Sequence, residues 1–207
     1  MIDEYLCIRN SIMAMKCALV IPVKTFSSGK SRLASDLTLF ERKNFIVKSL
    51  KNSIDVAKRS KFIDEILIVS NSKDMADIFI NMGLKFCYTT NTLNRALEQS
   101  VQSVASHVDN IIISAADLAN VISFEPIIGS LGYDRIVLCP DRHRIGTNII
   151  AHKSQHKLSY SFGANSFIKH LSSVSRLASP IEILQSSQYS LDVDTIHDLK
   201  LSELMKN

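Results

Sequence analysis

The sequence predicts an α/β fold: a three-layer α/β/α sandwich around a mostly parallel sheet. Three short apolar runs, at residues 18–23, 65–70 and 110–114, are rich in β-branched residues and too short for helices, which indicates buried strands. Segments with helical spacing of apolar residues separate them, and such alternation is typical of a parallel sheet. Because crossover connections are right-handed, helices are expected on both faces of the sheet.

The other elements follow in chain order. Helices are expected over residues 39–57, 74–82, 93–106, 123–130 and 167–173, strands over 85–88 and 135–139, and an apolar run over 148–151. Helix caps are expected from Thr38 with Glu41, from Ser72, from Thr92, and from Thr195 with Asp198, and Gly83 is expected to stop the second helix.

Length and composition predict one domain. With 207 residues, 46% of them hydrophobic, residues 17–207 can form a single core, and Met1–Lys16 is expected to be an N-terminal extension, with Met13 or Met15 as alternative starts. No apolar run approaches the roughly 20 residues of a membrane span, and the first residues lack signal-peptide features. We therefore expect a soluble, cytoplasmic protein without a membrane partner.

The net charge and the spacing of the cysteines argue against several classes of protein and kinds of site. A net charge of +4 without tryptophan argues against nucleic-acid binding and suits a small anionic substrate. The four cysteines are far apart, so neither a zinc site nor a disulfide framework is predicted; three of them adjoin strand runs and are expected to be buried thiols. The six histidines show no metal-ligand spacing and no catalytic triad.

A polar loop directly after the first strand is the first candidate site. It carries the cations Lys24, Lys30 and Arg32, while Ser28 and Gly29 can offer main-chain donors. Open α/β sheets bind ligands at the carboxyl ends of their strands, so the loop is a candidate phosphate-binding element. It is not a P-loop, because the earlier glycine of that motif is absent. The alternative is a solvated loop without a specific ligand.

Three aspartates form the second candidate site. Asp117 follows the strand run at 110–114, and Asp192 and Asp194 are two residues apart, so in an extended segment they point to one face. Magnesium prefers oxygen ligands and usually takes one or two carboxylates together with substrate phosphates. The pattern therefore predicts a Mg²⁺ site, although each aspartate alone could simply be a strand end or a residue before a helix cap.

Two further segments are candidate anion sites. In residues 140–148, Gly146 allows close backbone approach, and Thr147 carries a hydroxyl and an N–H group. Gly163 and Ser166 precede a helix, whose N-terminus favours anions. The alternative is a hairpin turn and an ordinary serine cap. No general base is apparent, and a reaction in which a phosphate is the attacking group needs none, because a phosphate monoester is already largely dianionic at neutral pH.

Motifs in this order resemble the guanylyltransferases of coenzyme F420 biosynthesis, which act on 2-phospho-L-lactate or phosphoenolpyruvate. The resemblance spans residues 18–201 and rests on short motifs: Pro22-Val-Lys24, Gly29-Lys-Ser-Arg-Leu33, Leu93-Asn94 with Ala96, Ala116-Asp117-Leu118, Pro140-Asp141-Arg142, Gly146-Thr-Asn148, Phe162-Gly163, Asn165-Ser-Phe167 with His170, and Leu191-Asp-Val-Asp194.

The resemblance implies the nucleotide-diphospho-sugar transferase (GT-A-like) fold and a magnesium-dependent reaction. GMP would pass from GTP to the phosphate of phosphoenolpyruvate or 2-phospho-L-lactate, with 3-phosphoglycerate as a third option, and pyrophosphate would leave. By position, the metal ligands would be Asp117, Asp192 and Asp194, and the phospho-acid ligands Thr147, Gly163 and Ser166. Catalysis would fall to Lys24, Lys30 and Arg32, and the nucleotide would be held by these together with Ser28, Gly29 and Asn94.

Three residues depart from the family pattern. Ala119 stands where the family usually has proline, which is expected to leave the metal loop less rigid because proline restricts φ. Arg144 and Ile145 stand where the family favours glycines, and their bulky side chains are expected to narrow or recharge the acid pocket. Two other functions therefore stay open: a nucleotidyltransferase that uses another nucleotide or a phosphosugar, and a non-catalytic nucleotide-binding module. We also leave open whether the chain forms a homodimer.

Overall fold

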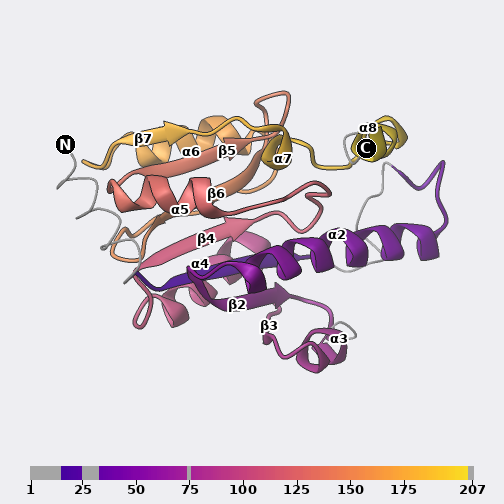
Figure 1. Ribbon diagram of the computed structural model, residues 1–207, viewed down its shortest axis with the longest axis horizontal. Helices are drawn as coiled ribbons and strands as arrows, with labels where there is room; N and C mark the ends of the chain where they lie inside the picture. The colour runs from indigo at the N-terminus through magenta and orange to yellow at the C-terminus, as the bar shows by residue number, and fades with distance from the viewer. Residues whose placement is uncertain (1–14, 25–32, 74–75, 205–207) are drawn as a thin grey trace.

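The computed structural model describes residues 15–24, 33–73 and 76–204, and these form a seven-stranded sheet (Figure 1). The strands are β1 (Cys17–Val23), β2 (Ile63–Ser70), β3 (Lys85–Tyr88), β4 (Asn110–Ser114), β5 (Ile136–Pro140), β6 (Thr147–Lys153) and β7 (Ile181–Ile183). Their order across the sheet is β3-β2-β1-β4-β6-β5-β7. The central pair, β1 and β4, is therefore flanked on both sides.

Strand direction makes the sheet mixed but mostly parallel, as predicted. β1 pairs in parallel with β2 and β4, β2 with β3, and β5 with β7. β6 instead runs antiparallel to both β4 and β5. The turn between β5 and β6 is thus a hairpin, and its ends lie at the edge where β1 and β4 end.

Helices cover both faces of the sheet (Figure 1). They are α2 (Leu39–Arg59), α3 (Ala76–Asn81), α4 (Leu93–Val104), α5 (Glu125–Gly132), α6 (Ser166–Val174), α7 (Ser187–Ser190) and α8 (Ile196–Leu204). One core joins the sheet to α2, α3, α5 and α7, and a second core joins its other face to α4 and α6. The predicted three layers are confirmed.

The strands β1 and β5 are apolar along their whole length because both of their faces are buried. In β1, Leu19 and Ile21 contribute to one core, while Ala18 and Val20 contribute to the other. A third, smaller cluster contains Leu33, Ala119 and Val193, and α8 packs against it. In Figure 1, α8 lies beyond one end of the sheet.

Several local predictions are confirmed. Thr38 and Glu41 form a full capping box at the start of α2. At α8, the Asp198 amide donates to the Thr195 hydroxyl oxygen, and the Asp198 carboxylate accepts from the Thr195 amide. Gly83 has a φ of 71°, as expected for a helix stop.

Other local predictions were wrong. Thr92 occupies the N-cap position of α4, but its side chain makes no capping hydrogen bond. The helix expected to reach residue 106 ends at Val104, and Ala105 is its C-cap. β7 and α7 were not predicted, since three and four residues are too few to show a periodic pattern.

Cys17 and Cys139 are buried in the sheet, as expected, whereas Cys87 on β3 is only partly buried. Burial raises the pKa of the Cys17 thiol to about 11, and it also raises the pKa of Cys139. Of the helices in the described part of the chain, none is long and apolar enough to cross a membrane.

Candidate functional site

A cavity of about 670 Å³ opens at the sheet edge where β1 and β4 end. It is lined by residues from the end of β1, the turn after β4, the β5–β6 hairpin, the loop before α6 and the segment before α8. The lining residues include Lys24, Asp117, Thr147, Gly163, Ser166, Asp192 and Asp194. Seven residues predicted from separate motifs are thus brought together.

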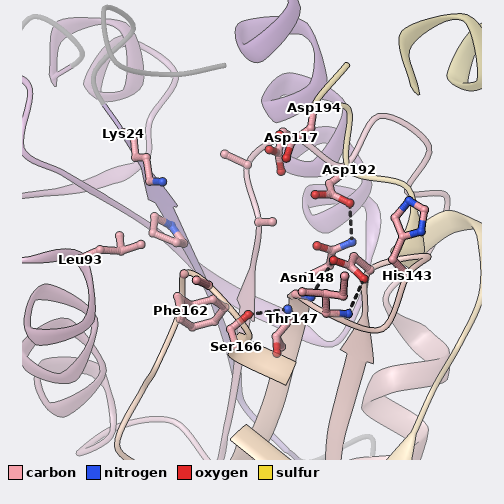
Figure 2. A pocket seen from close by; sticks show the side chains of 18 of the residues that line it. Lys24, Leu93, Asp117, His143, Thr147, Asn148, Phe162, Ser166, Asp192 and Asp194 are labelled. Atoms are coloured by element: carbon pink, nitrogen blue, oxygen red, sulfur yellow. Dashed lines mark hydrogen bonds between the residues drawn. The ribbon is translucent and has the colours of Figure 1, made fainter. Parts of the chain in front are cut away.

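The three aspartates form one side of this cavity, which we call the carboxylate wall (Figure 2). Asp192 and Asp194 are half-buried and flank the fully buried Val193, so the predicted alternation is confirmed. A bridge pairs Leu118 with Asp192, which brings the turn after β4 alongside this segment. The Asn148 side-chain amide donates to the Asp192 carboxylate over 3.4 Å.

Asp198 supports the carboxylate wall from α8. Its Oδ2 atom accepts hydrogen bonds from the Asp194 and Thr195 amides at 3.1 and 2.8 Å. Its Oδ1 atom forms an ion pair with Arg142 in the β5–β6 hairpin. Burial works to raise the pKa of Asp198, but these hydrogen bonds and Arg142 outweigh it, so the pKa is lowered.

The β5–β6 hairpin is closed by Asp141, whose carboxylate accepts from the Ile145 and Gly146 amides at 2.9 and 2.6 Å. A Cβ atom on Gly146 would lie 2.8 Å from this carboxylate, so the close approach expected at Gly146 is made by Asp141 itself. Arg144 has a φ of 57°, a conformation that glycine adopts readily, and its guanidinium lies over the Phe167 ring. Of the two bulky residues, Ile145 lines the cavity and Arg144 does not.

Facing the carboxylate wall are Thr147 and residues 161–166, which we call the loop wall. The Thr147 amide donates to the Ser166 hydroxyl oxygen at 2.8 Å (Figure 2). The Thr147 hydroxyl lies 2.9 Å from Nδ1 of His170. Thr147 and Ser166 are buried, and Gly163 is exposed with a φ of 120°. Thr147 and Ser166, which were both predicted to bind an anion, are therefore also hydrogen-bonded to one another.

The other predicted residues are distributed differently. Lys24 is exposed and lines the cavity. Ser28, Gly29, Lys30 and Arg32 lie outside the described residues. Asn94, predicted to hold the nucleoside, bonds instead to the main chain of Phe162 with both ends of its amide.

A second, smaller cavity of about 50 Å³ adjoins the first. The two share Val23, Lys24 and Leu93. Its remaining lining lies at the ends of β2 and β3 and at the start of α4, and it is partly polar, with Ser70, Asn71, Thr89 and Asn91. This recess can hold a small group that forms hydrogen bonds.

The carboxylate wall can hold a metal ion only together with a ligand. Within residues 15–24, 33–73 and 76–204, no three His, Cys, Asp or Glu side chains are arranged to hold a metal ion by themselves. The wall nevertheless offers only oxygen donors, which suits Mg²⁺, and Mg²⁺ commonly needs just one or two carboxylates when phosphate oxygens complete its shell. The residues present therefore fit a magnesium ion that is shared with a phosphorylated ligand.

Sequence patterns did not predict the supporting contacts of four residues, which are Asn94, Asp141, Asn148 and His170. Each acts through a hydrogen bond to a residue distant in the chain or to a turn amide, and such contacts leave no periodic signal. The only available signal was membership of the short motifs, which marks these residues without giving their partners.

Solved structures identify the fold as that of nucleotide-diphospho-sugar transferases. A protein assigned to that class from Desulfovibrio desulfuricans superposes with a TM-score of 0.72 at 14% identity, covering 89% of this chain and 85% of the other. The 4-diphosphocytidyl-2C-methyl-D-erythritol synthase of Anaerococcus prevotii gives 0.66 at 13% identity, covering 96% of this chain and all of the other. The predicted GT-A-like fold is confirmed.

The chain belongs to the CofC-like guanylyl transferase family, whose model matches residues 17–206. It is 27% identical to a phosphoenolpyruvate guanylyltransferase of Sphaerobacter thermophilus, over 87% of this chain and 89% of the relative. It is 30% identical to a 2-phospho-L-lactate guanylyltransferase of Methanocaldococcus jannaschii, over 89% and 81%. The chain is thus an enzyme of the nucleotidyltransferase type, and the predicted family is confirmed.

Proposed function

We propose that the protein is a magnesium-dependent guanylyltransferase of coenzyme F420 biosynthesis. It transfers GMP from GTP to the phosphate of phosphoenolpyruvate or 2-phospho-L-lactate and releases pyrophosphate. Relatives with both of these names support the acceptor class, since each aligns over more than four-fifths of this chain. The observation that carries the proposal is that Lys24, the carboxylate wall and the loop wall all line one cavity.

The acceptor would lie at the loop wall. Residues 163–165, directly before α6, line the cavity and can offer main-chain N–H groups, and Thr147 and Ser166 can offer hydroxyls, which together suit a carboxylate or a phosphate. Ile145 adds apolar surface on the same side of the cavity. A small acid that carries both a phosphate and an apolar carbon frame matches this lining.

The nucleotide would enter from the end of β1. Lys24 would bind the triphosphate, and Lys30 and Arg32 of the same loop would add charge to it. The guanine base would face the smaller cavity, which adjoins Lys24 and carries amide and hydroxyl groups, and whose volume of about 50 Å³ suits a polar edge of the base. The α-phosphorus then lies between the cations and the loop wall.

In the reaction, an oxygen of the acceptor phosphate attacks the α-phosphorus of GTP. The new bond joins this oxygen to phosphorus, the bond to the bridging oxygen of the β-phosphate breaks, and pyrophosphate leaves with that electron pair. No proton has to be removed, because the acceptor phosphate is largely dianionic at neutral pH. The protein therefore contributes position and positive charge.

Magnesium would be held by one or two of the carboxylates of Asp117, Asp192 and Asp194 together with phosphate oxygens of the substrates, and when bound it would neutralise phosphate charge. Asn148 and Asp198 would orient this wall, through the Asp192 carboxylate and the Asp194 amide respectively.

The proposal is tested by pyrophosphate release from the full chain with MgCl₂. GTP, CTP, ATP and UTP are each combined with phosphoenolpyruvate, 2-phospho-L-lactate, 3-phosphoglycerate or a panel of sugar phosphates, and EDTA serves as the metal control. We expect release only with GTP and one three-carbon acid, and none with EDTA. Turnover with another nucleotide or with a sugar phosphate would overturn the substrate assignment, and binding of GTP without any release would indicate a non-catalytic module.

A further inference from the structure

The loop wall takes a backbone path that needs support. Gly163 has a φ of 120°, and Asn165, at the N-cap of α6, has a φ of 55°. Glycine adopts a positive φ readily and asparagine does so more often than most residues, so these two residues permit the path, while contacts from other elements fix it. Residues 162–166 all line the cavity, so their main-chain direction decides which groups a ligand meets.

One support comes from α4. The Oδ1 atom of Asn94 accepts from the Phe162 amide at 2.8 Å, and its Nδ2 atom donates to the Phe162 carbonyl at 3.2 Å. A side-chain amide is needed for this pair of contacts, because one end must accept while the other donates. Asn94 thus fixes the peptide groups on both sides of Phe162, directly before Gly163.

The second support is His170, which is fully buried on α6. The Ser161 amide donates to its Nε2 atom at 2.9 Å. A main-chain amide can only donate, so Nε2 carries no proton, and the neutral ring must carry its proton on Nδ1. Nδ1 therefore donates to the Thr147 hydroxyl oxygen, 2.9 Å away. The ring also meets the edge of the Phe162 ring, with centroids 4.8 Å apart.

These contacts form one unit. Asn94 and His170 hold two consecutive amides, those of Phe162 and Ser161, from helices α4 and α6. His170 also reaches Thr147, whose amide binds Ser166. All three residues that the proposed function gives to the acceptor are thereby linked to two side chains that do not line either cavity in the described part of the chain.

We propose that Asn94 and His170 are positioning residues for the phospho-acid acceptor, which act by holding the loop wall in its binding conformation. This inference rests on the proposed function. It reassigns Asn94, which family resemblance gives to the nucleoside: the adjacent Leu93 lines both cavities, whereas the Asn94 amide is turned to Phe162.

The test for Asn94 separates the two substrates. For the full chain and for Asn94→Ala, kcat and the KM values of GTP and of the acceptor are measured from pyrophosphate release. Because two hydrogen bonds to the loop are lost, we expect the acceptor KM to rise about tenfold or more while the GTP KM changes less than about twofold. Gln102→Ala, an exposed amide truncation on the same helix, is the control and should change neither value.

If Asn94→Ala does not fold, Asn94→Asp replaces it. The aspartate keeps the acceptor for the Phe162 amide but faces the Phe162 carbonyl with an oxygen, so the same rise in acceptor KM is expected. A rise in the GTP KM with an unchanged acceptor KM, in either variant, would overturn the reassignment. An unchanged acceptor KM would overturn the proposal as a whole.

For His170, two substitutions each keep one contact. The amide nitrogen of Asn lies as many bonds from Cβ as Nδ1 does and can still donate to Thr147, while the amide oxygen of Gln matches Nε2 and can still accept from Ser161. Each is expected to raise the acceptor KM about tenfold with little change in the GTP KM. His152→Gln is the matched control, since His152 is equally buried but contacts Tyr160 and the Lys153 carbonyl.

The control separates positioning from general destabilisation. His152→Gln should lower the thermal midpoint without changing the ratio of the two KM values. If the His170 variants behave in the same way as His152→Gln, the proposal for His170 is wrong. If the unaltered chain releases no pyrophosphate with any pair of substrates, the proposed function fails, and this inference fails with it.

Discussion

The two walls of the large cavity are built on different physical principles. The carboxylate wall consists of charged, half-buried side chains on a turn and an extended segment. The loop wall consists of neutral groups, and Thr147 and Ser166 in it are buried and bonded to one another. Charge close to solvent suits a ligand that brings cations, whereas a neutral hydrogen-bonded wall suits recognition of shape and of a fixed anion. Substitutions should therefore affect activity and stability differently on the two sides.

The largest effect is expected from Asp117→Ala. Loss of one carboxylate from the proposed metal site should lower kcat by about a thousandfold or more, comparable with removal of a group that stabilises a transition state. The thermal midpoint should stay close to that of the unaltered chain, because Asp117 is half-buried and lies in a turn. Pyrophosphate release and thermal unfolding measure the two quantities.

The control for Asp117→Ala is Asp77→Ala, which removes an exposed carboxylate from α3. It should leave kcat unchanged. Full activity in Asp117→Ala would show that the reaction does not need the carboxylate wall. It would also contradict the functional difference that we expect between the two walls.

The next effect is the dependence of stability on pH, which comes from two buried histidines, one of which supports the loop wall. Burial lowers the pKa of His170 and of His152 to about 4, below the ordinary value of about 6.5. Between these values the unfolded chain binds a proton that the native chain does not, so stability is complete above about pH 6.5 and falls as the pH decreases toward 4. Each histidine accounts for about 3 kcal/mol over this window.

Urea unfolding at a series of pH values from neutral to about 4.5 measures this effect. His170→Asn cannot take up the proton, so its free energy of unfolding should depend less steeply on pH than that of the unaltered chain. Equal pH dependence in both proteins would show that the loop wall is not supported by a neutral imidazole.

A smaller effect is expected where α8 supports the carboxylate wall. Asp198→Ala removes the cap of α8, the support of the Asp194 amide and the partner of Arg142. The free energy of unfolding should fall by about 2 kcal/mol, and kcat should fall with it. Chemical denaturation and steady-state kinetics measure the two changes.

Glu203→Ala, an exposed substitution in α8, is the control for Asp198→Ala. It should change neither stability nor kcat. If Asp198→Ala lost stability but kept full kcat, Asp198 would be a helix cap alone, and the carboxylate wall would not depend on it.

The smallest effect is expected at the tip of the β5–β6 hairpin. The left-handed conformation of Arg144 is unfavourable for a residue with a Cβ atom, and stacking of its guanidinium on Phe167 offsets part of this cost. Arg144→Ala keeps the strain and loses the stacking, whereas Arg144→Gly loses both. The glycine variant should therefore be more stable than the alanine variant by about 1 kcal/mol, as measured by denaturation. The reverse order would contradict this account.

Sequence reasoning recovered the parts of the molecule that depend on pattern. The strands β3 and β4 were placed correctly because apolar runs between turn residues define them, and Asp117, Asp192 and Asp194 were brought together because strand ends meet at one edge. The loop wall could not be derived in the same way. Its structure depends on contacts between residues far apart in the chain, such as Asn94 with Phe162, and on one tautomer of His170.

The departures from the family pattern also needed the structure. Arg144 and Ile145 were both expected to alter the acid pocket, yet only Ile145 lines the cavity. The difference follows from the left-handed backbone at Arg144, which directs its side chain over Phe167. Ala119, in place of the usual proline, is buried in the small cluster that includes Val193, so packing supports the turn after Asp117.

The reversed direction of β6 has an evolutionary consequence. Because β6 starts where β1 and β4 end, the sheet delivers a hairpin turn to its ligand edge, and that turn can accept new residues without changing the strands that carry the core. The side of the cavity that we propose for the acceptor can therefore change in sequence while the strands that lead to Lys24 and Asp117 stay as they are. The single antiparallel strand thus separates the segment proposed to select the acceptor from the strands that lead to the residues proposed for the transfer step.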